Sequence, residues 1–166
     1  RPDNLSFEPL SELVPHAVVS ANSQLAALDT ISLEQLASGP LPDIHLMLVG
    51  DGPDEALLQN LAEELGLGNH VSFFPFTSKP DIVFERADIT VLPSLYKEGL
   101  PNVLQESMAM NVPVISSRIG GVPEVVLDGQ TGYMFEPGNS AQLAEAVLKL
   151  WTDQEAYRRI CLQTRE

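Results

Sequence analysis

Short apolar runs alternate with amphipathic segments along most of the chain. Six such runs are bounded by turn residues, at positions 16–20, 44–49, 71–74, 89–92, 112–116 and 132–135. Apolar runs of this length predict buried strands. Strands that are apolar on both faces fit a parallel sheet that is covered by helices on either side.

Helical patterns lie between these runs. Leu57, Leu58, Leu61 and Leu65 recur at helical spacing within 54–65, and the glycines that follow are typical of a helix end. Further helices are expected at 79–86, 102–110, 140–151 and 153–163. Asn139 or Ser140 would cap the fourth of these five helices, and Asp153 the last. The alternation predicts an α/β fold, a Rossmann-like three-layer αβα domain with a parallel sheet of about six strands.

The composition narrows the functional classes. The chain has 166 residues, 44% of them hydrophobic, and a net charge of −14, so it is expected to be globular and to form about one domain. Residues 1–78 contain one basic residue, Arg1, against eleven acids. This balance argues against a nucleic-acid partner, which needs a basic surface. The acids are interpreted as a solvated face that aids solubility.

Two features of the sequence concern the cellular compartment of the protein and the extent of the chain. Cys161 is the single cysteine, which favours a reducing compartment, and we therefore expect a cytoplasmic protein. The chain starts at Arg1 without a methionine and ends in a charged helical run. We expect it to be a piece of a longer protein.

In parallel sheets, ligands bind at the loops that leave the carboxyl ends of the strands. The first such loop carries Gly50 and Gly52. It resembles the start of a dinucleotide fingerprint, but Glu55 occupies the third glycine position, so a dehydrogenase is disfavoured. The alternative is a tight strand-to-helix turn in which Asp54 favours the helix start.

The second loop leads into the helix expected at 102–110. Pro101 suits a first helical turn, and the free N–H groups of Asn102, Val103 and Leu104 would form an anion site. Glu106 lies on the face that Asn102 and Val103 share. A second carboxylate, Glu98, precedes the helix. Carboxylates bind vicinal hydroxyls, so a sugar and a ribose would fit here. Two solvated glutamates at a helix start are the alternative.

The third loop contains Gly120 and Gly121. Arg118 in this loop could reach a phosphate, but we favour a structural ion pair with an acid. His16, His45 and His70 lack metal-ligand spacing, and no metal site is expected.

From about residue 41 to 165 the chain resembles the C-terminal, donor-binding half of the family 4 retaining glycosyltransferases, which have the two-domain GT-B fold. The paired glutamates Glu98 and Glu106, with seven residues between them, are the hallmark of that family. The matching segments follow in the family's order: 46–53 (LMLVGDGP), 71–76 (VSFFPF), 87–94 (ADITVLPS), 98–113 (EGLPNVLQESMAMNVP), 120–124 (GGVPE) and 128–137 (DGQTGYMFEP).

This resemblance implies a function for the parent protein. The parent would transfer a sugar from a UDP- or GDP-sugar to a glycan or lipid-linked acceptor, with retention and without a cofactor or metal. The acceptor would bind the N-terminal domain, and the parent would associate peripherally with the cytoplasmic face of a membrane.

The resemblance also implies a role for each site residue. Glu98 would contact the donor sugar as the catalytic residue, and Glu106 would hold the ribose. The backbone of 99–104, which includes Gly99, Leu100, Asn102, Val103 and Leu104, would meet the sugar and pyrophosphate. Phe74 and Phe76 would lie near the nucleobase. Gly50 and Gly52 complete the candidate binding residues, because glycines let a backbone approach a ligand closely.

One departure bears on activity. The family holds the diphosphate with an Arg and a Lys near the start of this domain, whereas 17–30 contains neither. We therefore expect residues 1–40 to be divergent or a remnant of the acceptor domain, and 41–166 to be the donor domain. The chain alone would be inactive or weakly active, and could dimerise through an exposed apolar flank. A degenerate non-catalytic module and a nucleotide-sugar epimerase are the alternatives.

Overall fold

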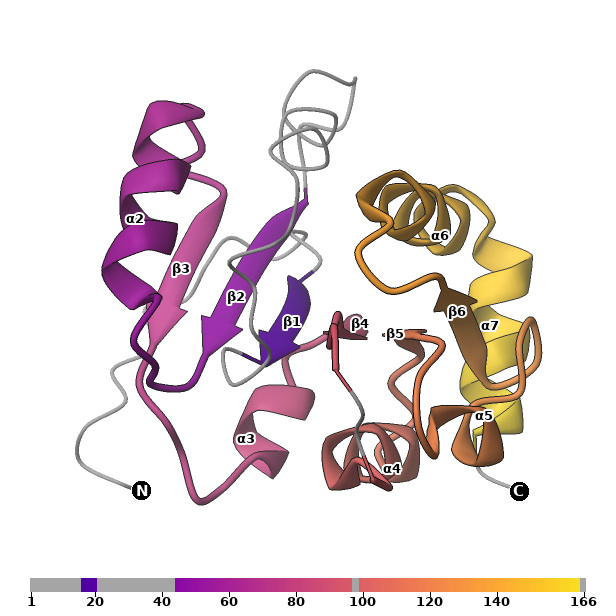
Figure 1. Cartoon of the computed structure of the whole chain (residues 1–166). Coiled ribbons are helices and arrows are strands. Elements are labelled where there is room, and N and C mark those ends of the chain that lie inside the picture. Colours follow the sequence, from indigo (N-terminus) through magenta and orange to yellow (C-terminus); the bar gives the residue numbers. More distant parts are fainter. Residues whose placement is uncertain (1–15, 21–43, 97–98, 165–166) are drawn as a thin grey trace.

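The strands form one parallel sheet. In the part of the chain that the computed structural model describes, residues 16–20, 44–96 and 99–164, six strands are ordered β3-β2-β1-β4-β5-β6 (Figure 1). Their bounds are β1 His16–Ser20, β2 His45–Val49, β3 Val71–Phe74, β4 Ile89–Leu92, β5 Val114–Ser117 and β6 Gly132–Phe135. Every neighbouring pair is parallel.

Four of the predicted strands have the predicted bounds. β2 starts one residue later than expected, and β5 is shifted from 112–116 to Val114–Ser117. The shift of β5 has a local cause. The N–H of Val112 bonds to the carbonyl of Ser107 at 3.1 Å, and Pro113 has no N–H to give to a neighbouring strand.

The expected helices all form, with ends that differ by at most two residues. They are α2 Glu55–Glu64, α3 Asp81–Phe84, α4 Asn102–Ala109, α6 Ser140–Thr152 and α7 Gln154–Gln163, with a short α5 at Val122–Val125. Of the two candidate caps of α6, Asn139 accepts the hydrogen bond, from Gln142 N. Asp153 caps α7 as predicted.

Helices cover both faces of the sheet. Alternate residues of the strands face opposite layers, as strand geometry requires. On one face, Leu48, Val91, Ile115 and Phe135 pack with buried side chains from α6 and α7. On the other face, Leu92 and Val114 pack with α4 and α5, and Met47 packs with Val83 of α3.

The connectivity creates a reversal in the middle of the sheet. From β1 the chain adds β2 and β3 towards one edge, and then β4, β5 and β6 towards the other. Connections on the two sides of β1 and β4 therefore diverge, and the carboxyl ends of these strands border a crevice. β1 precedes the expected domain boundary at residue 41 and pairs with both β2 and β4. Residues 1–15 and 21–43 lie outside the described part of the chain, so the domain assignment stays a prediction.

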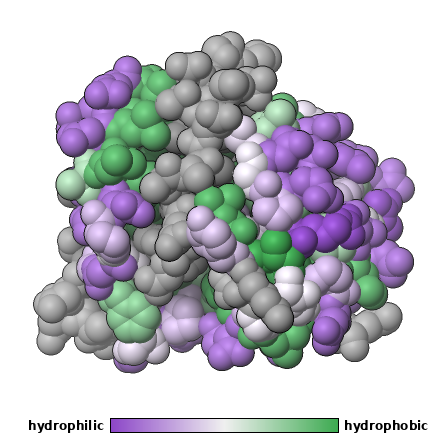
Figure 2. All heavy atoms as spheres, viewed as in Figure 1, coloured by the Kyte–Doolittle hydropathy of each residue, from purple (hydrophilic) through white to green (hydrophobic). Residues whose placement is uncertain are grey.

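Polar side chains gather on the layer formed by the last two helices. Figure 2 shows hydrophilic residues over the side of the molecule that carries α6 and α7. On α7, exposed residues include Glu155, Arg158 and Arg159. Within the described ranges, no helix has the length and apolar character that a membrane span needs.

Candidate functional site

A cleft of about 310 Å³ opens at the carboxyl edge of the sheet, between β2, α3 and α4. It lies beyond the carboxyl ends of the strands, where the reversal of the strand order between β1 and β4 predicts a ligand site. Its lining comes from four separate segments: Val49, Gly50, Phe76, Thr77, Ser78, Pro80, Val83, Phe84, Val103 and Glu106.

The orientation of α4 is set by its buried face. Leu104, Ser107 and Met108 are buried. The hydroxyl oxygen of Ser107 lies 2.8 Å from Thr90 Oγ1 and 3.1 Å from the carbonyl oxygen of Val112. These contacts tie α4 to β4 and to the chain that follows α4. The opposite face of the helix, with Val103 and Glu106 one turn apart, is therefore turned towards the cleft.

The first turn of α4 offers hydrogen-bond donors. Pro101 precedes the helix in an extended conformation, and no side chain caps it within the described residues. The N–H of Leu104 donates to the carbonyl of Pro101 at 3.2 Å. Our prediction of three free donors is therefore wrong for Leu104. The N–H groups of Asn102 and Val103 have no acceptor among the described residues, and such orphan groups attract anions.

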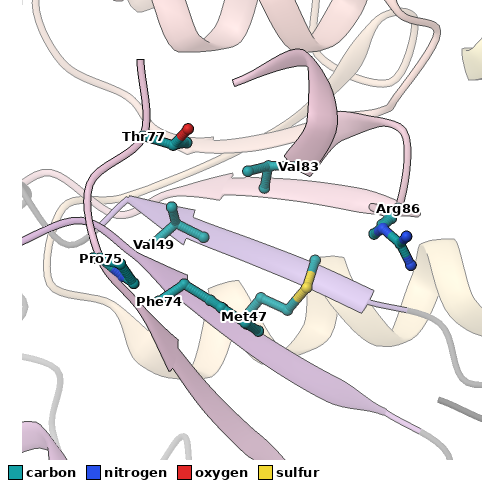
Figure 3. Close-up of a pocket in the computed structure, with 7 residues that line it drawn as sticks. All are labelled: Met47, Val49, Phe74, Pro75, Thr77, Val83 and Arg86. Atoms are coloured by element: carbon teal, nitrogen blue, oxygen red, sulfur yellow. The ribbon is translucent and has the colours of Figure 1, made fainter. Parts of the chain in front are cut away.

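The opposite wall of the cleft is built from β2, β3 and α3. Gly50 has φ 135, a conformation that favours glycine, and its N–H donates to the carbonyl of Phe74 at 2.9 Å. This explains one of the two glycines in the first loop. Figure 3 shows Val49 and Val83 side by side in a smaller pocket, where Phe74 and Met47 also lie. The wall near the sheet is therefore apolar.

The charges of the cleft are sparse. No Lys or Arg is found among its described lining residues, and Glu106 is the ionisable side chain there. Lys79 follows Ser78 in the β3–α3 connection and is exposed. An anionic ligand would depend on backbone N–H groups and the dipole of α4.

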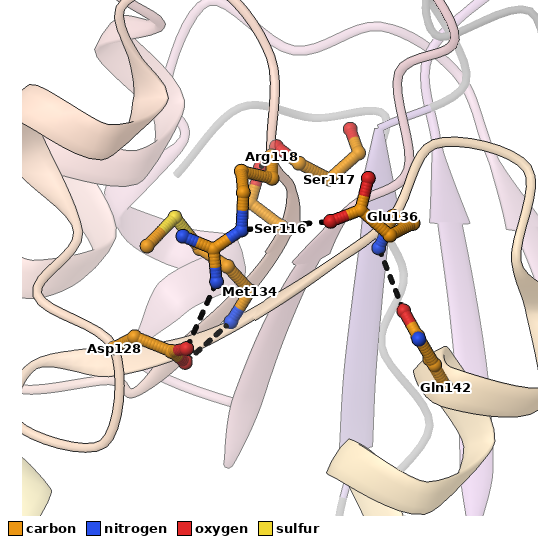
Figure 4. A network of polar contacts seen from close by, with 7 residues as sticks. All are labelled: Ser116, Ser117, Arg118, Asp128, Met134, Glu136 and Gln142. Carbon is orange, nitrogen blue, oxygen red and sulfur yellow. Dashed lines mark hydrogen bonds and ion pairs between the residues drawn. The ribbon is translucent and has the colours of Figure 1, made fainter.

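Arg118 is held in an ion-pair network (Figure 4) and is not among the lining residues of the cleft. Its Nη2 lies 3.0 Å from Asp128 Oδ2, and its Nε lies 3.7 Å from Glu136 Oε1. Asp128 Oδ1 also accepts the N–H of Met134 at 3.0 Å. The expected structural pairing of Arg118 is confirmed. It joins the ends of β5 and β6.

The structure brings together part of the predicted site. Gly50, Phe76, Val103 and Glu106 line the one cleft. Gly52 lines a different, small pocket with Leu58 and Phe73, and Phe74 lines the pocket of Figure 3.

Other predicted site residues contribute backbone or lie elsewhere. The side chain of Leu104 has no exposed surface. Gly99, Leu100 and Asn102 precede or begin α4 without lining the cleft. Glu98 is outside the described residues. Among the described residues, no three His, Cys, Asp or Glu side chains are grouped so that they could hold a metal.

Sequence reasoning missed the contribution of the β3–α3 connection beyond Phe76. Three residues of this connection line the cleft, Thr77, Ser78 and Pro80, and α3 adds Val83 and Phe84. The rule that ligands bind beyond the carboxyl ends of strands applies to this connection as well. The signal was available, since β3 was predicted with its observed bounds.

Comparison with known proteins identifies the family. The profile of the family described as "Glycosyl transferases group 1" matches residues 27–166. This chain belongs to that family. N-acetyl-alpha-D-glucosaminyl L-malate synthase from Bacillus anthracis is 36% identical over 124 residues, which are 75% of this chain and 32% of the relative. The GDP-mannose-dependent alpha-(1-6)-phosphatidylinositol monomannoside mannosyltransferase of Mycolicibacterium smegmatis is 36% identical over 121 residues, 68% of this chain and 32% of the relative.

Solved structures agree on the architecture. Anabaena HepE in complex with UDP-glucose has a TM-score of 0.79 and 25% identity, with 91% of this chain and 43% of that chain covered. The C-terminal domain of the group 1 glycosyl transferase LpcC from Francisella tularensis has a TM-score of 0.75 and 22% identity, with 92% and 84% covered. The chain is therefore the C-terminal half of a GT-B fold. It spans about a third or less of the length of the curated relatives it matches.

Proposed function

We propose that this chain binds the donor of a retaining hexosyltransferase, and that the parent protein moves a hexose from a UDP- or GDP-sugar to a glycan or lipid-linked acceptor. The observation that best supports this proposal is the cleft at the carboxyl ends of the strands, where the strand order reverses. It places an exposed carboxylate, Glu106, beside the first turn of α4.

The lining suits a nucleoside diphosphate in three parts. The Glu106 carboxylate would accept hydrogen bonds from both hydroxyls of the ribose. The N–H groups of Asn102 and Val103 would donate to the diphosphate. Phe76, whose side chain is 64% exposed, offers an aromatic face to the base.

Two relatives support a nucleotide-sugar donor. HepE was crystallised with UDP and with UDP-glucose, and the mycobacterial relative is named as dependent on GDP-mannose. The base therefore stays open between uracil and guanine in the proposal. Glu98, which lies outside the described residues, is proposed to contact the donor sugar because it resembles the first of the family's paired glutamates.

In the proposed reaction, α4 would stabilise the nucleoside diphosphate as it leaves the sugar. Negative charge grows on the diphosphate as the bond to the sugar breaks, and donors fixed in advance at that position lower the barrier. The N–H groups of α4 are held in place by the buried side of the helix, including the Ser107 contacts. They would need little reorganisation as the charge develops.

Calorimetric titration of the 166-residue chain with UDP, GDP and ADP tests the proposal. One nucleotide should bind saturably, and Glu106→Gln should raise its Kd about tenfold or more, the value of a hydrogen bond to a charged group. Glu145→Gln is the matched control, because Glu145 is an exposed carboxylate on α6 and should leave the Kd unchanged. Equal binding by the Glu106 variant, or no binding by folded wild-type chain, would refute the donor site.

One observation favours a second candidate, a non-catalytic binding module. The described lining of the cleft contains no basic side chain to balance a diphosphate. The two candidates differ in the full-length protein. A transferase releases free nucleotide from its nucleotide-sugar when acceptor is present, whereas a module binds the nucleotide without turnover.

A further inference from the structure

The connection from β4 to α4 is held by a buried hydroxyl of the neighbouring strand. Ser117, the last residue of β5, has no exposed surface. Its Oγ lies 2.6 Å from the carbonyl oxygen of Ser94 and 3.4 Å from that of Leu92. Ser94 stands at the start of the connection. Removing a short hydrogen bond between buried groups costs free energy, because the lost bond is not replaced by one to bulk water.

The other described end of the connection is held by the turn that follows β5. The N–H of Gly121 donates to the carbonyl of Gly99 at 3.0 Å. Gly99 precedes α4 by three residues. A β-carbon at Gly121 would also lie 3.4 Å from Leu100 Cδ1, so the two segments are in close contact. One element, β5 with its turn, thus contacts both Ser94 and Gly99.

We infer that Ser117 is a positioning residue for the first turn of α4. Its hydroxyl holds the chain as it leaves β4, and the turn at Gly121 holds it as it enters α4. Together with the buried face of α4, they set where the N–H groups of Asn102 and Val103 lie. This inference rests on the proposed function, since a positioned helix start matters for affinity only if a diphosphate binds there.

Ser116 provides an internal control for this role. It is also fully buried, and its Oγ lies 3.1 Å from the Leu92 carbonyl oxygen and 3.4 Å from that of Ser117. Both acceptors belong to strand residues, and not to the connection that follows β4. Ser116→Ala therefore removes a hydroxyl of the same burial and keeps the hydrogen bond from Ser117 Oγ to the Ser94 carbonyl.

The experiment compares Ser117→Ala with Ser116→Ala by three measurements: urea unfolding, backbone amide chemical shifts, and UDP and GDP titration. Both variants should lose stability to a similar extent. Ser117→Ala alone should shift the amide resonances of Gly99, Asn102 and Val103. It alone should raise the nucleotide Kd about tenfold, as expected when one charge-assisted hydrogen bond is lost.

Several outcomes would overturn the inference. Unchanged amide shifts at the start of α4 in Ser117→Ala would do so, and so would an equal rise in Kd for Ser116→Ala. If the wild-type chain binds no nucleotide, the proposed function fails, and the amide shifts still decide whether Ser117 positions α4. If Ser117→Ala does not fold, Ser117→Cys is measured in the same way, because it keeps a small side chain and weakens the hydrogen bond.

Discussion

Replacing Gly121 by alanine should destabilise the chain by an amount that follows from its contact with Gly99. The new β-carbon would lie 2.5 Å from the carbonyl oxygen of Gly99 and 3.2 Å from its carbonyl carbon. Ordinary contact begins at 3.4 Å, so the two backbones must separate by about 0.9 Å (3.4 minus 2.5). That movement stretches the 3.0 Å hydrogen bond from Gly121 to Gly99.

The cost combines overpacking with a weakened hydrogen bond. Overpacking costs about 1–3 kcal/mol and a hydrogen bond contributes about 1 kcal/mol, so we expect a loss of about 2–4 kcal/mol. For a chain of this size, each kcal/mol lowers Tm by roughly 2–4 °C, which predicts a fall of roughly 4–16 °C. Urea unfolding followed by circular dichroism measures the free energy directly, and the slope with urea should not change.

Gly68→Ala is the matched control for Gly121→Ala. A β-carbon at Gly68 meets no atom within 4 Å, and its φ is not positive. This variant should be as stable as the wild type or more stable by about 0.4–1 kcal/mol, because alanine lowers the conformational entropy of the unfolded chain. If the free energy of unfolding of Gly121→Ala equals that of Gly68→Ala, the β5–α5 turn can move away from Gly99 at no cost. The argument for a rigid contact between Gly121 and Gly99 is then refuted.

Two further predictions concern α7. Asp153→Ala should cost about 1 kcal/mol in urea unfolding, because Asp153 Oδ1 accepts the N–H groups of Glu155 and Ala156 at 3.1 and 2.9 Å. Asp54→Ala removes an N-cap residue that makes no side-chain cap bond and should cost under about 0.5 kcal/mol; equal losses would contradict the capping argument. Burial raises the pKa of the Tyr157 phenol, with smaller contributions from the charges of its neighbours. The folded state therefore keeps the proton that the unfolded chain releases near pH 10, so this contribution to stability is full below about pH 10 and falls above it. Tyr157→Phe should reduce the loss of stability between about pH 9 and 11, measured as the free energy of unfolding in urea at each pH. If the stability of the variant falls with pH as steeply as that of the wild-type chain, this prediction is contradicted.

The elements were predictable because their signals are local. The leucines of α2 recur with the helical period, and Gly66 follows with φ +69, as a helix end requires. β5 shows the limit of local pattern. Val112 and Pro113 are apolar and buried, yet the hydrogen bond of Val112 belongs to the end of α4 and not to the sheet.

The candidate site was predictable in part for the same reason. Val103 and Glu106 share a helical face whatever the fold, and the structure turns that face to the cleft. Leu104 shows what spacing leaves undecided. Its N–H was expected to be free, but it donates a hydrogen bond to the carbonyl of Pro101 in the first turn of the helix. The shape of the first turn depends on how the preceding connection is held.

By itself the sequence determined which segments become strands and helices, because side-chain period and turn residues act over a few neighbours. It also contained the paired glutamates, whose spacing needs no fold to be recognised. Tertiary structure alone decided that Val49, Val83 and Glu106 would line one cleft. It also decided that the turn at Gly121 would meet Gly99. These juxtapositions follow from the strand order, and strand order depends on contacts between residues far apart in the chain, which no local pattern encodes.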